Sequence, residues 1–129
     1  MIKINRVEKH IIKSNNKYYN LLDEFCYKSK NLYNCANYII RQEFINNGKW
    51  IRYNDLDKIL KKEGNDFDYR NMPLANTSQQ CLRLLDKNWK SFFQLIKDYR
   101  KNPNKYLGRP RPPKYKSKNG RNILILTNQ

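Results

Sequence analysis

The sequence predicts a mainly helical fold, with a three-helix, helix-turn-helix-like unit between two short β-strands. Two long stretches place apolar residues every three or four positions, which is the spacing of one buried face on an α-helix. β-branched and other strand-forming residues gather instead near both ends, over residues 2–13 and 122–127. The chain has 129 residues, of which 39% are hydrophobic, so a single domain with a small core is expected.

The first part of the chain is expected to form a strand and then a long helix. Residues 2–13 alternate apolar and polar side chains loosely, which is typical of a strand. The turn-forming sequence SNN follows at residues 14–16. Apolar or small residues then recur at helical spacing from Lys17 to about Asn46, and Gly48 suits the left-handed C-cap that ends such a helix.

Two further helices are predicted before the composition changes. A short one covers about residues 54–62, where Asn54 or Asp55 can cap its start. The next opens between residues 73 and 77 and continues to about residue 100, with an apolar stripe in steps of three and four residues. This spacing is close to a coiled-coil repeat, so we expect the two long helices to pack nearly antiparallel. Trp89 and Phe93 lie in or beside the stripe and are assigned to the core.

The net charge of +16 indicates a polyanionic partner, although an AT-rich genome could also enrich the chain in Lys and Asn. The distribution of charge separates these explanations. Residues 1–99 carry 18 basic and 11 acidic side chains, whereas residues 100–129 carry nine basic and no acidic ones. Four of those nine are Arg, which such a codon bias does not favour. A segment with one sign of charge is the pattern of a surface that follows a phosphate backbone.

The segment after the third helix is rich in proline and cannot be helical between residues 108 and 120. Its cations recur every two to four residues, so in an extended chain they can meet successive phosphates, while Tyr106 and Tyr115 can stack on bases. A solvated linker and a proline-rich ligand for a partner protein are the alternatives. The candidate phosphate-binding residues are Arg100, Lys101, Lys105, Arg109, Arg111, Lys114, Lys116, Lys118 and Arg121, with Tyr115 as the stacking residue.

Other functional classes find little support in the sequence. There is one His, the three Cys are not clustered, and the 11 acidic residues are scattered, so we expect no metal site and no catalytic residue. A glycine-rich phosphate loop is absent, and no cofactor or small-molecule substrate is expected. No apolar run is long enough for a membrane span or resembles a signal peptide. Unclustered cysteines are typical of a reducing cytoplasm, so a cytoplasmic protein is expected.

Residues 77–93 (TSQQCLRLLDKNWKSFF) and 108–116 (GRPRPPKYK) carry a resemblance to a known family. In their order and spacing they resemble the amino-terminal region of the TnpB (OrfB) proteins of insertion sequences, which are RNA-guided DNA nucleases also described as probable transposases. The extra proline at 112–113 departs from the family pattern. The resemblance covers nearly the whole chain, and the nuclease carboxylates and zinc element of the family lie downstream of the matching region.

The resemblance implies a division into three parts. Residues 1–14 would be the first strand of a wedge β-barrel, residues 15–102 a helical recognition lobe, and residues 103–129 a basic segment with a returning strand. The lobe and wedge of the family bind guide RNA and target DNA. The matching positions in this chain that would contact nucleic acid are Tyr53, Asn76, Gln79, Gln80, Thr127 and Asn128.

We therefore expect a nucleic-acid-binding amino-terminal part of a TnpB-like nuclease, without catalysis of its own. Its partners would be DNA and guide RNA, together with the remainder of the nuclease. Two alternatives stay open from the sequence. One is a helical adaptor that binds proteins through its aromatic stripe and proline-rich tail. The other is a stand-alone DNA-binding regulator derived from such a nuclease.

Overall fold

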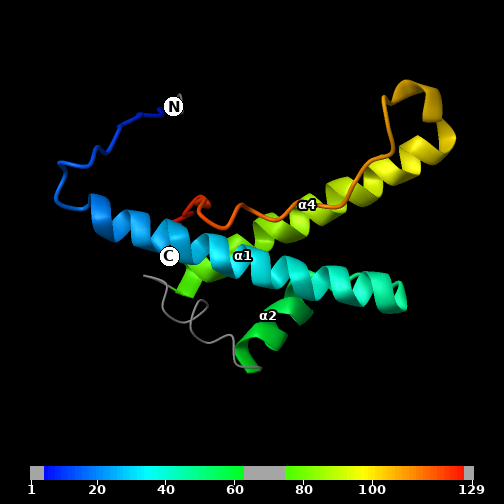
Figure 1. Cartoon of the computed structure of the whole chain (residues 1–129), viewed down its shortest axis with the longest axis horizontal. Coiled ribbons are helices and arrows are strands. Elements are labelled where there is room, and N and C mark those ends of the chain that lie inside the picture. The colour runs from blue at the N-terminus through cyan, green and yellow to red at the C-terminus, as the bar shows by residue number, and fades with distance from the viewer. Residues whose placement is uncertain (1–4, 63–74, 127–129) are drawn as a thin grey trace, which may run out of the picture.

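The computed structural model describes residues 5–62 and 75–126, and within these residues it contains helices and no strand (Figure 1). Helix α1 spans Tyr19–Asn47, α2 spans Tyr53–Lys62, and α4 spans Ala75–Lys101. A single 3-10 turn, η1, follows at Pro103–Lys105. The three predicted helices are confirmed, each within about two residues of its expected bounds. The described part of the protein is therefore mainly α.

Local backbone contacts explain where α1 begins and ends. Asn16 forms the entry turn, because its side-chain Oδ1 accepts a hydrogen bond of 2.9 Å from the Tyr18 amide and its carbonyl accepts one of 3.1 Å from the Tyr19 amide. At the other end, Gly48 has a φ of 66° and its amide donates to the Phe44 carbonyl at 2.9 Å. The predicted left-handed glycine cap is confirmed.

The core forms where the apolar faces of the three helices meet. Trp89 is completely buried, and its ring lies 5.7 Å from that of Phe92 and 5.9 Å from those of Phe44 and Phe93. The assignment of Trp89 to the core is confirmed, and the half-buried Phe93 packs against it. The buried core side chains are Leu32, Tyr33, Ala36 and Ile40 of α1, Leu56 and Leu60 of α2, and Cys81, Leu82, Leu85, Trp89, Phe92 and Ile96 of α4.

The two long helices run in the same direction, so the prediction of antiparallel packing is wrong. The Cys81 thiol lies 3.6 Å from the Ser29 carbonyl, at the amino-terminal halves of both helices. Towards the carboxyl-terminal ends, the rings of Phe44 and Phe92 are 6.5 Å apart. In Figure 1, α1 and α4 cross at an oblique angle, and both run from left to right from their amino-terminal to their carboxyl-terminal ends. An apolar stripe determines which face of a helix is buried, but it carries no information about helix direction.

The two expected terminal strands are not formed in the described residues. Residues 5–13 extend away from the helices, and their apolar side chains Val7 and Ile11 are 88% and 86% exposed (Figure 1). Residues 121–126 lie against α1, where the Asn122 amide donates to the Cys26 carbonyl at 3.2 Å. A strand requires a neighbouring strand for its backbone hydrogen bonds. Here the second segment bonds to a helix, and the first has no described partner.

Candidate nucleic-acid interface

The basic tail begins with a sharp change of direction that is centred on Asp98. Its carboxylate accepts hydrogen bonds from Asn102 at 3.2 Å, from the Lys105 ammonium at 3.3 Å and from the Tyr106 hydroxyl. The hydroxyl is the main cause that lowers the pKa of Asp98 below its usual value. The ring of Tyr106 also packs edge-on against Tyr99, with centroids 5.8 Å apart. Lys105 and Tyr106 therefore hold the turn together.

After this turn, the tail runs back along α1 and is held by polar side chains of that helix. Asn37 is completely buried; its Nδ2 donates to the Pro113 carbonyl at 3.0 Å, and its Oδ1 accepts from the Trp89 indole at 2.9 Å. Arg41 donates to the same Pro113 carbonyl at 2.5 Å, and its guanidinium lies 4.9 Å from the Tyr115 ring centre. The tail is thus attached directly to the core through Asn37.

The next contacts toward the amino terminus of α1 come at one-turn intervals. Asn34 pairs with the backbone of Lys116 in both directions, because its Nδ2 donates to the carbonyl at 2.9 Å and its Oδ1 accepts from the amide at 2.8 Å. Lys30 is 2% exposed, and its ammonium donates to the Lys118 carbonyl and lies 3.9 Å from the Tyr27 ring centre. These contacts bind the backbone of the tail, while the Lys116 ammonium lies 5.1 Å from the Tyr33 ring centre and its side chain stays exposed.

The last anchor lies near the start of α1. The guanidinium of Arg121 donates two hydrogen bonds to the Asp23 carboxylate, at 2.8 and 3.1 Å, and this contact lowers the pKa of Asp23. Asn122 is buried and donates to the Ser29 hydroxyl at 3.2 Å, which in turn donates to the Ile123 carbonyl at 2.9 Å. The tail is therefore a docked strap along α1, from Pro113 to Ile123.

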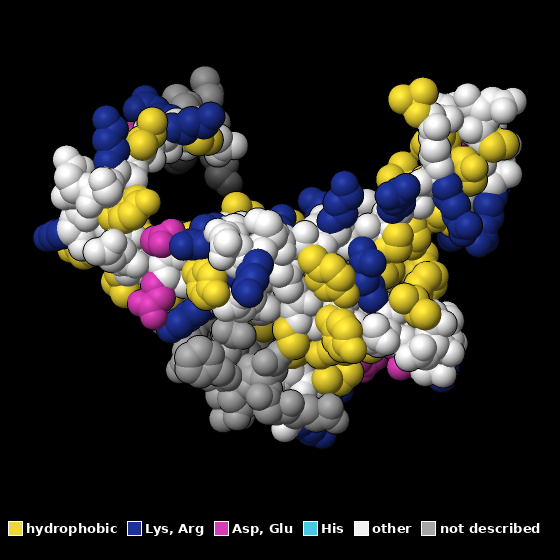
Figure 2. All heavy atoms as spheres, in the orientation of Figure 1, with side chains coloured by type: hydrophobic (Ala, Val, Ile, Leu, Met, Phe, Trp, Pro, Cys, Tyr) yellow, Lys and Arg dark blue, Asp and Glu magenta, His cyan; other side chains and the backbone are white. Residues whose placement is uncertain are grey.

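The predicted cations fall into two groups. Lys105 and Arg121 form ion pairs within the fold, with Asp98 and Asp23. The other seven are exposed and form no ion pair with any carboxylate in the described ranges 5–62 and 75–126. Figure 2 shows Lys and Arg side chains, interspersed with apolar ones, along the face over which the tail runs. These seven are Arg100, Lys101, Arg109, Arg111, Lys114, Lys116 and Lys118.

Five of the seven meet along the seam between α4 and the tail, which forms adjacent clefts. A cleft of about 310 Å³ is lined by Arg100 and Arg109 with Ile96 and Tyr99. A larger open cleft of about 370 Å³ lies further along the seam. Its lining residues are Tyr33 of α1, Asn88, Ser91, Phe92 and Leu95 of α4, and Arg111, Pro113, Lys114, Tyr115 and Lys116 of the tail. Lys101 and Lys118 lie outside these two clefts.

The four described positions taken from the family resemblance do not line the two clefts of this seam. Asn76 is buried at 4% exposure, and Gln79 is half-buried at the start of α4. Gln80 lines a separate cleft of about 230 Å³ with Arg83 and Ile125 among its other walls.

Tyr53 is the first residue of α2, and the Arg83 guanidinium lies 4.2 Å from its ring centre. Desolvation is the main cause that raises the pKa of the Tyr53 hydroxyl. Thr127 and Asn128 lie outside the described residues. The contribution of all six family-derived positions to nucleic-acid binding stays a prediction.

The α1 residues that hold the tail are not among the candidate residues predicted from the sequence. Lys30, Asn34, Asn37 and Arg41 recur in steps of three or four residues, which is a polar stripe beside the apolar one. That spacing was the available signal, but exposed helix faces carry the same residue types. Sequence alone therefore gave no reason to assign them a partner.

The chain matches no protein-family model, no curated protein and no solved structure. In the described part of the chain, no helix is long and apolar enough to cross a membrane. Among the same described residues, no three His, Cys, Asp or Glu side chains are grouped so that they could hold a metal ion. Burial raises the pKa of the Cys81 thiol to about 11, so this cysteine is a packing residue.

Proposed function

We propose that this chain is a nucleic-acid-binding module, the amino-terminal part of a TnpB-like RNA-guided nuclease, and that it carries no catalysis of its own. Guide RNA and target DNA are the proposed partners. The segments 77–93 and 108–116 support the family assignment through their resemblance to that region of the TnpB proteins. Binding would be driven mainly by charge, with the tail as the principal contact.

The observation that carries the proposal is the way the tail is docked. The backbone of Pro113, Lys116 and Lys118 is bound by α1, which fixes the chain at intervals of two or three residues. The cationic side chains are left facing solvent with no described carboxylate to neutralise them. A row of cations in fixed positions matches the regular repeat of charge on a polynucleotide. A solvated linker would have no such ordered backbone.

The first test is the dependence of affinity on salt. Each phosphate contact releases counterions, so the logarithm of the association constant should fall with the logarithm of salt concentration by about 0.7 to 0.9 per contact. Fluorescence anisotropy with a labelled RNA and a labelled DNA duplex measures this slope. An affinity that stays flat from low to high salt would contradict charge-driven binding.

Charge reversal localises the interface. Changing Arg109, Arg111, Lys114 and Lys116 to Glu should abolish binding and leave the helical circular-dichroism signal intact, because all four side chains are exposed. A matched control makes the same change in net charge at exposed residues away from the seam: Lys9, Lys13, Lys49 and Lys58. The control should weaken binding far less. Equal losses in both variants would show that net charge alone, and no defined site, drives binding.

A further inference from the structure

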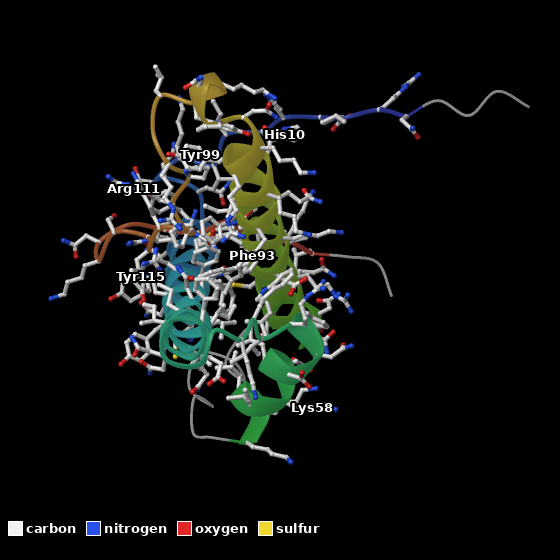
Figure 3. All side chains as sticks on the ribbon, turned by 90° about the vertical axis from the view of Figure 1, so that its right-hand side faces the viewer. His10, Lys58, Phe93, Tyr99, Arg111 and Tyr115 are labelled. Atoms are coloured by element: carbon white, nitrogen blue, oxygen red, sulfur yellow. The ribbon has the colours of Figure 1, made fainter. Side chains whose placement is uncertain are left out.

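The larger cleft in the seam has cationic, apolar and hydrogen-bonding walls, and purely electrostatic binding needs only the cationic one. Arg111, Lys114 and Lys116 stand on the tail side. Leu95 and Tyr115 are 46% and 44% exposed, so apolar surface faces the same opening as the cations. Figure 3 shows Arg111 and Tyr115 on the same side of the molecule, with Lys58 of α2 at the far end.

The cleft also offers hydrogen-bonding groups in a held position. Ser91 is exposed on α4, and Asn88 lies about one turn before Ser91 and two turns before Leu95 on the same wall. The Asn88 Nδ2 donates to the Tyr33 hydroxyl at 3.0 Å, which fixes the orientation of its amide. Arg41 covers one face of the Tyr115 ring and so holds this side of the cleft. A hydroxyl and an amide above an apolar floor can recognise a flat, polar-edged ligand.

We propose that this cleft holds one unstacked base of a single-stranded polynucleotide. The base would lie against Leu95 and Tyr115, with Ser91 and Asn88 at its edge. The flanking phosphates would contact Arg111, Lys114 and Lys116. This inference rests on the proposed function and adds the substrate class: the seam takes a single strand, whether RNA or DNA.

Duplex nucleic acid does not suit the cleft in the same way. In a duplex the bases are stacked and present only their edges in the grooves. A single strand can turn a base out and place it on an aromatic or apolar surface. The volume of about 370 Å³ is at the lower end for small-ligand pockets, which is appropriate for one nucleotide.

The test fills the cleft without changing any charge. Ser91→Leu places a larger apolar side chain in the cleft, and Gln94→Leu makes a comparable change at an exposed α4 residue that does not line it. Both variants are measured by anisotropy at one salt concentration against single-stranded RNA, single-stranded DNA, duplex DNA and an abasic oligonucleotide of equal length. Circular dichroism and urea unfolding establish that both variants fold.

We expect Ser91→Leu to weaken binding of both normal single strands about tenfold, the size of one stacking contact, and to leave abasic and duplex binding unchanged. Gln94→Leu should change none of them. If the affinity fell only for single-stranded RNA or only for single-stranded DNA, the site would be specific for a base on ribose or on deoxyribose, respectively. Equal effects on normal and abasic strands, or no effect at all, would overturn the base pocket while the seam still binds phosphates. Failure of the wild-type chain to bind any of the four would overturn the proposed function itself.

Discussion

Asn37 is the residue that joins the core to the basic tail. It is a completely buried amide, and each of its two polar atoms has a partner from a different part of the chain. The Oδ1 accepts from the Trp89 indole at 2.9 Å, and the Nδ2 donates to the Pro113 carbonyl at 3.0 Å. A buried indole N–H that loses its partner is costly, because the donor has been removed from water and no acceptor repays that desolvation.

We predict that Asn37→Leu lowers the free energy of unfolding by about 2 kcal/mol, because it leaves the Trp89 indole unsatisfied. Urea denaturation measures this change. Two further variants serve as controls. One carries Trp89→Phe alone, and the other carries both Trp89→Phe and Asn37→Leu. Once the indole is gone, replacing Asn37 should be much less destabilising, and the cycle gives the coupling between the two residues. A coupling of zero would mean that this hydrogen bond contributes nothing to stability.

At the scale of the elements, the end of α1 depends on one backbone conformation. Gly48 has a φ of 66°, which L-residues with a side chain rarely adopt, and among the described residues no atom apart from those of its chain neighbours lies within 4 Å of where its Cβ would be. A side chain at this position is therefore unfavourable because of backbone strain alone, and it would not clash with other described residues.

We expect Gly48→Ala to destabilise the protein by roughly 1 kcal/mol, as measured by urea or thermal unfolding. Gly108 is the matched control, since it also has open space around it but lacks a positive φ. Gly108→Ala should leave stability unchanged or raise it slightly, because it restricts the unfolded chain. If the two substitutions had the same effect, the left-handed cap would not be what stabilises this end of α1.

The elements also show how far sequence reasoning extends. The three helices could be predicted because each has a periodic apolar face, and the end of α1 because Gly48 is suited to only a few roles. The absence of the two expected strands could not be predicted. Residues 5–13 and 121–126 have the composition of strands, but whether a strand forms depends on which segment lies beside it. The direction of α4 relative to α1 could not be predicted either, because the spacing of apolar residues is the same for parallel and antiparallel helices.

For the whole molecule, the cations of the candidate site were predictable, but their arrangement was not. A run of basic residues without acidic ones is visible in the sequence, yet only the fold shows that Lys105 and Arg121 are used internally. The strap is held by α1 residues about 80 positions earlier in the chain, such as Asn34 for Lys116. No local pattern in the tail encodes a partner so distant in sequence.

This arrangement leads to a prediction about binding that involves no charged residue. Asn34→Ala removes both hydrogen bonds to the Lys116 backbone and should release the middle of the strap. Stability should fall by about 1 to 2 kcal/mol. Affinity for nucleic acid should also fall several-fold at low salt, because the freed cations must be ordered again when they bind, at a cost in conformational entropy.

The control is Asn20→Ala, an exposed amide in the first turn of α1, which should change neither stability nor affinity. Anisotropy titrations of the two variants, both with the wild-type net charge, isolate the effect of position from that of charge. Unchanged affinity in Asn34→Ala, together with the expected loss of stability, would mean that the docked strap serves folding alone. A loss of affinity confined to Asn34→Ala would instead mean that α1 sets the positions at which the tail meets phosphate.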